Sequence, residues 1–387
     1  MPKLPQLRPW SVKALLLIGL PASIVFISLG VYVATLPMNS QPLSPIVVSL
    51  DQPTLRYGKI KSPVEESVAV NNDTNQTSTT TSKKGSKNTG QVAGTTSPGA
   101  VTPAPAGSLI GIYDTSSPSD PVSHQRLKDI AAGGFNIVHN YTPWDGSIAQ
   151  IRAYLDTAQS VGIRIVFSLK DFYDKESYVP LSEVSQHGST YDQVALNLVQ
   201  QLKNHPAIYG WSISDERPET PASLASWLPV LQQRAQAIRQ IDPNHPTLGV
   251  MQCYPGTYLN DTGSLNQLGT AMTDLGLDTY PIPYNDINLV GQCASTLAKS
   301  NITGRRWFVV QSFSWKSYPD IPNGLGYNLS QARYPTKAEL QTMVNQARSN
   351  GANNIMFYSY FDMKKDTANF ATNWANLTEV VKQMKQP

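Results

Sequence analysis

Short apolar runs alternate with helical patterns from Ser108 onward, and this alternation constrains the fold more than any other feature of the chain. Between the runs lie amphipathic segments, of which the clearest repeats apolar residues at helical spacing from Leu224 to Ile238. Strands that alternate with helices in this way predict a parallel sheet in an α/β protein. The eight runs are SLIGIYD, FNIVHNY, IRIVFSL, IYGWSIS, TLGVMQC, LGLDTY, WFVVQSF and NIMFYSY.

Helix-boundary signals agree with this division. Ser147 and Thr336 each precede a Gln or Glu by three residues, the spacing of a capping box, and Gly162 and Gly351 stand where helices should end. Eight strand–helix units in about 280 residues predict a (β/α)8 TIM barrel. A doubly wound open sheet is the alternative, but it usually carries a glycine-rich phosphate turn after its first strand, where this chain has DTSSPSD.

The N-terminal segment predicts a membrane anchor. Residues 1–13 contain Lys3, Arg8 and Lys13. The uncharged segment at residues 14–36 is longer than the roughly 20 residues needed to span a bilayer. The positive-inside rule then keeps residues 1–13 in the cytoplasm and places the rest of the chain outside it. A cleavable signal peptide and a secreted protein are the alternative, although VYVATLP contains no clean small-x-small cleavage site.

Residues 37–107 predict a flexible linker between this anchor and the domain at 108–387. Most of the segment from 71 to 107 is Ser, Thr, Gly, Pro and Asn, and it cannot bury enough apolar surface to offset its ordering entropy. Residues 1–107 hold nine Lys and Arg against four acids, whereas residues 108–387 hold 21 against 23. The predicted domain is therefore nearly neutral, and we expect no nucleic-acid partner.

Two cysteines, Cys253 and Cys293, fall in neighbouring strand–helix units. They can form a disulfide or remain two buried thiols, and with scattered histidines they make no zinc pattern. We expect a monomer that binds neither a metal nor a cofactor.

The predicted strand ends carry acids, amides and aromatic residues. In a (β/α)8 barrel functional residues gather at these ends. Aromatic rings cover the apolar faces of sugars while acids and amides bind hydroxyls, so this mixture predicts a carbohydrate site. The alternatives are that the rings only pack and that Asp114 and Asp171 only cap helices. The candidate substrate-binding residues are Asp114, His139, Asn140, Trp144, Asp171, Tyr280, Gln311, Trp315, Tyr358 and Tyr360.

Two adjacent acids, Asp215 and Glu216, end the fourth run in WSISDERP. Strand periodicity places Ser212, Ser214 and Glu216 on the face toward the barrel interior, while Asp215 can turn either way. Two carboxyls in one cavity raise one apparent pKa, and a carboxyl that stays protonated near neutral pH can act as a general acid. The alternative is that Asp215 or a nearby acid caps the next helix.

The chain resembles the clan of (β/α)8 glycoside hydrolases over roughly residues 109–382, in strand order and in the W-x-x-x-(N/D)-E-x-P texture of WSISDERP. In that clan the acid/base glutamate follows an Asn at the end of strand four. The resemblance implies that Glu216 is the acid/base, that Asp215 replaces the Asn, and that Tyr280 in LDTYP matches a tyrosine near the nucleophile.

The seventh run departs from the clan, because Gln311 in VVQSFSW stands where a nucleophilic glutamate is expected. Three interpretations remain: Asp278 supplies the second carboxylate, the substrate's own 2-acetamido group attacks with Asp215 orienting it, or the barrel only binds glycan. We therefore expect a membrane-anchored, extracytoplasmic glycoside hydrolase acting on oligo- or polysaccharide. A catalytically inactive carbohydrate-binding barrel is the alternative.

Overall fold

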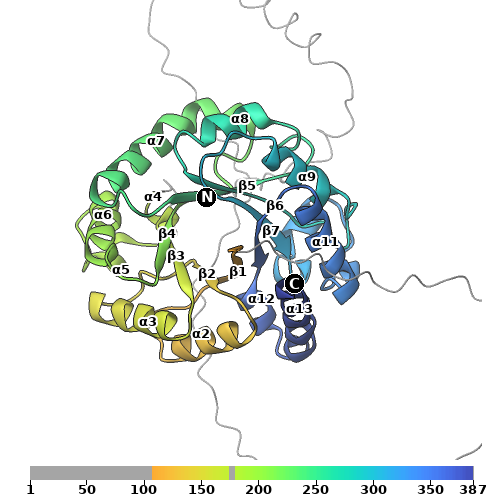
Figure 1. The fold of residues 1–387 in the computed structure, drawn as a ribbon, viewed down its shortest axis with the longest axis horizontal. Coiled ribbons are helices and arrows are strands. Elements are labelled where there is room, and N and C mark those ends of the chain that lie inside the picture. The colour runs from red at the N-terminus through yellow and green to blue at the C-terminus, as the bar shows by residue number, and fades with distance from the viewer. Residues whose placement is uncertain (1–106, 174–178, 387) are drawn as a thin grey trace, which may run out of the picture.

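The computed structural model describes residues 107–173 and 179–386, which form a closed barrel of eight parallel strands surrounded by helices (Figure 1). Each strand pairs with its sequence neighbours, and β1 pairs with β8 to close the barrel. The predicted (β/α)8 fold is confirmed. The strands are β1 (Ile110–Asp114), β2 (Ile137–Asn140), β3 (Arg164–Ser168), β4 (Ile208–Asp215), β5 (Thr247–Gln252), β6 (Asp274–Thr279), β7 (Arg306–Gln311) and β8 (Asn354–Tyr358).

Helices follow every strand and begin and end largely as the sequence signals indicate. Ser147 and Thr336 form complete capping boxes at the starts of α3 and α11. Gly162 and Gly351 have positive φ angles of 75° and 98° just beyond helix ends, a conformation that favours glycine. The helices are α2 (Val122–Ala132), α3 (Ile148–Ser160), α4 (Lys170–Tyr173), α5 (Leu181–Val184), α6 (Tyr191–Leu202), α7 (Leu224–Ile241), α8 (Thr262–Leu268), α9 (Leu289–Ala298), α10 (Asp320–Gly324), α11 (Lys337–Ser349), α12 (Tyr360–Lys365) and α13 (Phe370–Lys385).

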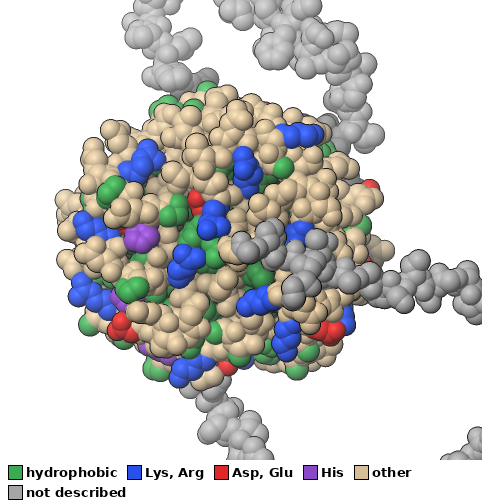
Figure 2. All heavy atoms as spheres, in the orientation of Figure 1, with side chains coloured by type: hydrophobic (Ala, Val, Ile, Leu, Met, Phe, Trp, Pro, Cys, Tyr) green, Lys and Arg blue, Asp and Glu red, His purple; other side chains and the backbone are tan. Residues whose placement is uncertain are grey.

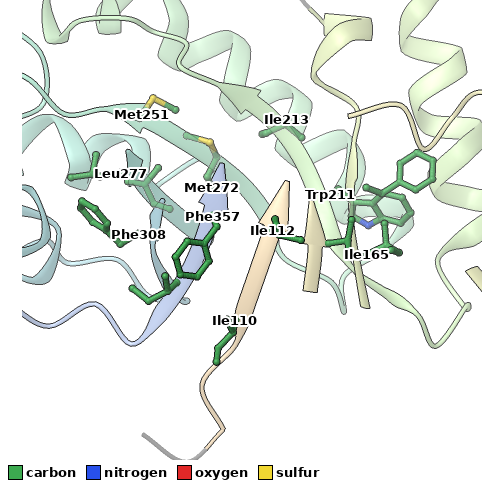
Figure 3. Packing of buried hydrophobic residues seen from close by; sticks show 14 of the residues in the cluster. Ile110, Ile112, Ile165, Trp211, Ile213, Met251, Met272, Leu277, Phe308 and Phe357 are labelled. Carbon is green, nitrogen blue, oxygen red and sulfur yellow. The ribbon is translucent and has the colours of Figure 1, made fainter. Parts of the chain in front are cut away.

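The main hydrophobic core lies between the strands and the helical ring. Alternate strand residues supply it, including Ile112 of β1, Trp211 and Ile213 of β4, and Phe357 of β8 (Figure 3). The outward direction of Trp211 and Ile213 agrees with the predicted strand periodicity. The barrel interior is a second, smaller core that includes Tyr209, Val250, Trp307 and Met356.

The eighth strand is shorter than the sequence run suggests. β8 ends at Tyr358, and Ser359 caps α12 by accepting a hydrogen bond from the backbone of Asp362. Tyr360 therefore begins a helix, and its ring packs edge-on against Trp374 of α13 at a centroid distance of 5.0 Å. The step from strand to helix turns Tyr360 away from the barrel axis.

A disulfide joins Cys253 to Cys293, so the end of β5 is covalently tied to α9. The sequence left this pairing open. Both half-cystines are fully buried.

The expected anchor at residues 14–36, and the linker at 37–107 apart from Gly107, lie outside the described residues. Within ranges 107–173 and 179–386, no helix combines the length and the apolar character needed to cross a bilayer. Figure 2 shows Lys and Arg side chains spread among uncharged ones over the face in view.

Candidate active site

The end of β4 turns both adjacent acids toward the same space. Residues that follow one another in a strand point to opposite faces, so a regular strand would separate Asp215 from Glu216. Glu216 instead has a φ angle of 56°, in the left-handed region that side chains other than glycine rarely adopt. Its backbone N–H donates to the carbonyl of Val250 at 2.7 Å and fixes this turn. The strained backbone conformation of Glu216 therefore brings both carboxyl groups into the same site.

A hydrogen-bond donor at or just beyond the end of another strand reaches each acid. The hydroxyl of Tyr141 donates to Oδ2 of Asp215 at 2.5 Å. The amide of Gln252, the last residue of β5, donates to Oε2 of Glu216 at 2.8 Å. Neither acid caps the next helix, and Glu219 instead pairs with Arg217.

A third carboxyl, that of Asp278 in β6, lies within hydrogen-bonding distance of the carboxyl of Glu216. Asp278 is 2% exposed, and its Oδ2 accepts a hydrogen bond from the hydroxyl of Tyr280 at 3.0 Å. Burial, followed by the negative charge of Glu216, raises the pKa of Asp278 well above its usual range. Burial and the neighbouring carboxyls therefore favour the protonated form of Asp278.

Asp215 is also a weak acid in this setting. Burial raises its pKa to about 7, and the charge of Glu216 acts in the same direction, while Lys170 and the Tyr141 hydroxyl oppose the rise. The ammonium of Lys170 pairs with Oδ1 of Asp171 at 2.9 Å and lies 4.6 Å from the centroid of the Tyr141 ring. Asp171 therefore contacts Lys170, which in turn lies beside Tyr141 at the site.

Aromatic rings form a continuous wall beside these carboxyls. The ring of Tyr280 lies 5.2 Å from Phe313, 6.2 Å from Trp315 and 5.6 Å from Tyr358, measured between centroids. Tyr280 and Tyr358 are buried, whereas Trp315 is partly exposed. The wall thus extends from the buried acids toward solvent.

His139 lies beside this wall, with its ring 4.3 Å from that of Tyr113 and 5.4 Å from that of Tyr141. Burial, with a smaller contribution from Lys170, lowers its pKa to about 3, so the imidazole is neutral. Neither ring nitrogen has a hydrogen-bond partner in the described part of the chain. Across residues 107–173 and 179–386, no group of three or more His, Cys, Asp or Glu could hold a metal ion.

Gln311 ends β7 with its amide bound to backbone. Its oxygen accepts from the N–H of Ile282 at 2.8 Å, and its nitrogen donates to the carbonyl of Ile282 at 2.8 Å and to that of Phe313 at 3.2 Å. The side chain is fully buried. Gln311 therefore holds the loop after β6 against the end of β7.

Four of the candidate substrate-binding residues face the helices instead of the three carboxyls. Oδ1 of Asp114 lies 3.6 Å from the guanidinium of Arg126 in α2. The amide of Asn140 donates to the hydroxyl of Tyr154 in α3 at 3.0 Å. The remaining two are Trp144, whose ring lies 5.5 Å from that of Phe172, and Tyr360, which packs on α13.

Sequence reasoning missed Gln252 and Tyr113. Gln252 is the last residue of the fifth strand, so applying the strand-end rule to that strand would have identified it. Tyr113 gave no such signal, because it lies one residue before the end of β1 and points inward by strand alternation.

No known family model and no curated protein match this sequence. A solved β-galactosidase from Bacillus circulans sp. alkalophilus superposes with a TM-score of 0.51 at 11% identity, over 72% of this chain and 56% of that chain. This chain thus spans just over half the length of the galactosidase. The chain has the fold of the (β/α)8 glycoside hydrolases.

Two further glycoside hydrolase structures align less closely. The endo-β-1,4-mannanase from Thermotoga petrophila is 10% identical, with 72% of this chain and 77% of that chain covered and a TM-score of 0.48. The β-1,4-mannanase from the sea hare Aplysia kurodai is 14% identical, with 70% and 92% covered and a TM-score of 0.43. The superposition on the β-galactosidase, at a TM-score of 0.51, confirms the resemblance to (β/α)8 glycoside hydrolases at the level of the fold.

Proposed function

We propose that this protein is a glycoside hydrolase that acts on oligo- or polysaccharide, with Glu216 as general acid/base and Asp278 as the second carboxylate. The observation that carries the proposal is the hydrogen-bonding contact between these two carboxyl groups at the carboxyl ends of β4 and β6. Two interacting carboxyls, of which Asp278 is favoured in its protonated form, can supply a protonated acid and a carboxylate, the two groups that glycoside hydrolysis requires.

The reaction follows from how that proton moves. Asp278, whose pKa is raised, first passes its proton to Glu216. Glu216 gives it to the glycosidic oxygen as the bond to the anomeric carbon breaks, and ionised Asp278 bonds to that carbon. Glu216 then takes a proton from water, which attacks the same carbon and releases the Asp278 carboxylate. The hydroxyl of Tyr280 donates to Asp278 and stabilises its ionised form.

The interaction between the two carboxyls bears on whether the reaction retains or inverts the anomeric configuration. Retaining enzymes hold their carboxyls about 5–5.5 Å apart, and inverting enzymes roughly 6.5–9.5 Å apart. A hydrogen-bonding separation is nearer to the retaining value. Substrate must then enter between the two groups and part them, and the sugar product should keep its anomeric configuration.

The proposed location is outside the cytoplasm, held to the membrane by residues 14–36, or secreted if that segment is removed. The uncharged segment and its positive flank support this location. The Cys253–Cys293 disulfide supports it independently, because disulfides persist in oxidising compartments.

The test is release of reducing sugar from a panel of glycans by the wild-type protein and matched acid-to-amide variants. Glu216→Gln and Asp278→Asn should each lose at least about 100-fold in kcat, because each removes one of two essential carboxyls. Glu379→Gln, an exposed acid paired with Lys337 on the outer helices, should keep wild-type activity. Full activity in Glu216→Gln would refute the proposal.

The substrate-assisted route, in which Asp215 orients a 2-acetamido group, has its own test. A thiazoline mimic of the bound oxazoline should then inhibit strongly, and Asp278→Asn should retain activity. Under the proposed carboxylate pair, the thiazoline has no effect and Asp278→Asn is inactive.

A catalytically inactive carbohydrate-binding barrel is the second candidate. The observation that favours it is Gln311, whose amide is fully bound to backbone where the clan resemblance places a nucleophile. This candidate predicts glycan retention on an array without any sugar release on long incubation. It also predicts that Glu216→Gln binds as tightly as the wild type.

A further inference from the structure

Tyr284 and Tyr327 form a stacked pair of rings outside the carboxyl cluster. The two ring centroids lie 4.6 Å apart and the ring planes meet at 4°. Both side chains are partly exposed. Tyr284 lies in the loop after β6, and Tyr327 lies in the connection from β7 to α11, so both belong to loops that leave the carboxyl ends of strands. Glu216 and Asp278 are at the same end of the barrel, which is where (β/α)8 enzymes bind their substrates.

The backbone keeps Tyr284 close to the aromatic wall of the site. The N–H of Asn285 donates to the carbonyl of Pro281 at 2.7 Å, which folds the chain into a single turn directly after Tyr280. The ring of Tyr280 belongs to the wall, and its hydroxyl donates to Asp278. Tyr284 therefore lies one backbone turn beyond a residue that contacts a carboxyl of the site.

The wall and the pair are built from the same two loops. The loop after β6 carries Tyr280 and Tyr284, and the connection from β7 to α11 carries Trp315 and Tyr327. Because β6 and β7 are neighbouring strands, these loops start side by side (Figure 1). Trp315, the partly exposed ring of the wall, lies 6.2 Å from Tyr280 between centroids. Each loop thus contributes one ring to the wall and, further along the chain, one ring to the pair.

The hydroxyls of the pair hold both rings in place. The hydroxyl of Tyr284 donates to the carbonyl of Asn328 at 3.0 Å, and that of Tyr327 donates to Oδ1 of Asn285 at 3.4 Å. Each tyrosine is therefore bonded to the residue that follows the other in the chain. A ring fixed in this way loses little conformational freedom when a ligand binds. Since both hydroxyl protons are already donated, a ligand would contact mainly the surfaces of the rings.

The surroundings of the pair suit a neutral sugar. The immediate chain neighbours of the two tyrosines are Pro283, Asn285, Gly326 and Asn328, and none of these four carries a charge. Aromatic surfaces cover the apolar C–H faces of sugar rings, and amides can donate to and accept from sugar hydroxyls.

We propose that the stacked pair of Tyr284 and Tyr327 is a second sugar-binding subsite, which holds a distal unit of the glycan whose scissile bond lies at Glu216. The inference rests on the proposed function for the reacting end of that glycan. It makes the substrate a neutral oligo- or polysaccharide long enough to contact the carboxyls and the pair together. A short glycan contacts only the carboxyls and the wall, so affinity should rise with chain length until the pair is reached.

The test is calorimetric binding of neutral oligosaccharides to the Glu216→Gln protein, which lacks the acid and should leave them intact. The probes are β-1,4-linked oligomers of glucose, mannose and galactose, each from disaccharide to hexasaccharide. In the series that binds, the hexasaccharide should bind at least about tenfold more tightly than the disaccharide, a gain typical of one stacking contact. Affinity that does not rise with length, or a lack of binding by every series, overturns the inference.

Variants of the pair separate a subsite from a purely structural stack. In the same background, Tyr284→Ala and Tyr327→Ala should each remove most of the gain with length and leave disaccharide affinity unchanged. Tyr284→Phe keeps the ring and should keep most of the gain, although it loses the bond to Asn328. Val230→Ala, which removes an exposed apolar side chain from α7, should keep the whole gain. Equal weakening of short and long oligomers in the alanine variants would show that the pair only fastens the two loops.

Hydrolysis by the protein with Glu216 intact distinguishes the two proposals. Cleavage of glycans without any dependence on chain length or on Tyr327 leaves the proposed function standing and removes the inference. Tighter binding of long oligomers that is lost in Tyr327→Ala, without cleavage of any glycan, removes the proposed function and supports the subsite.

Discussion

The side-chain amide of Gln311 bridges the peptide of Ile282, accepting from its N–H and donating to its carbonyl, both at 2.8 Å. The carboxylate of a glutamate could not make this pair of bonds, because it has no donor. The residue that stands where the clan resemblance places a nucleophile is therefore tied to the backbone of the neighbouring loop.

Gln311→Glu should destabilise the protein without creating a nucleophile. The change leaves the carbonyls of Ile282 and Phe313 without their donor and buries a carboxylate, at a cost of roughly 3–5 kcal/mol in the free energy of unfolding. Urea unfolding measures the cost, and Gln200→Glu on the exposed face of α6 is the control. A stable variant with raised activity would contradict this role.

Asp215→Asn should stabilise the protein at alkaline pH and not at acidic pH. The folded-state pKa of Asp215 is raised to about 7, so its favourable contribution is complete below the unfolded value near 3.9 and disappears as pH rises through 7. Relative to the wild type, the variant should gain roughly 2–4 kcal/mol between pH 4 and pH 8.

Denaturant unfolding at several pH values measures this gain. The groups that act on Asp215 are Lys170, Glu216, Tyr141 and Asp171, and all of them remain in the variant. Asp286→Asn, at an exposed loop position, should show no such pH dependence. A difference in stability that stays constant from pH 4 to pH 8 would count against the raised pKa.

Gln252→Leu should reduce kcat about 10- to 100-fold on any glycan that the wild-type protein cleaves. The variant removes the hydrogen bond to Oε2 of Glu216, and a bond to a charged group is worth about 1.5–3 kcal/mol. Steady-state kinetics should show the loss mainly in kcat, since Gln252 orients the acid. Wild-type kcat would show that Glu216 holds its position without this contact.

Cys293→Ser should lower the free energy of unfolding by about 2–5 kcal/mol, the usual effect of losing a native disulfide. Treating the wild-type protein with a reductant should produce the same decrease and should leave the variant unaffected. If reductant has no effect on wild-type stability, the bond contributes nothing measurable.

Much of the fold followed from residue patterns. Each of the eight apolar runs overlaps one strand of the barrel, because buried parallel strands are rich in apolar residues. Strand alternation also gave the correct direction for Trp211 and Ile213. Glu216 directly follows β4, but its left-handed backbone conformation and not strand alternation sets the direction of its side chain.

The arrangement of the site was harder to read. Asp114, Asn140 and Gln311 end their strands, and Asp278 lies one residue before the end of β6. Asp114 and Asn140 nevertheless point at helices. The face to which a side chain points depends on its place in the alternation of the strand and on the residue at which the strand ends. A shift of one residue in either turns the side chain to the opposite face. The left-handed turn at Glu216 had no sequence signal, because no glycine or asparagine stands there.

The disulfide joins Cys253 to Cys293, which are 40 positions apart in the sequence, and closes the segment between them into a covalent ring. Asp278 and Tyr280 lie in that segment. A protease that cut an exposed turn such as the one at Pro255 and Gly256 would open the ring without releasing a fragment. The nicked chain would migrate as one species until reduced. The segment that carries Asp278 is thereby fastened to the rest of the molecule at both ends.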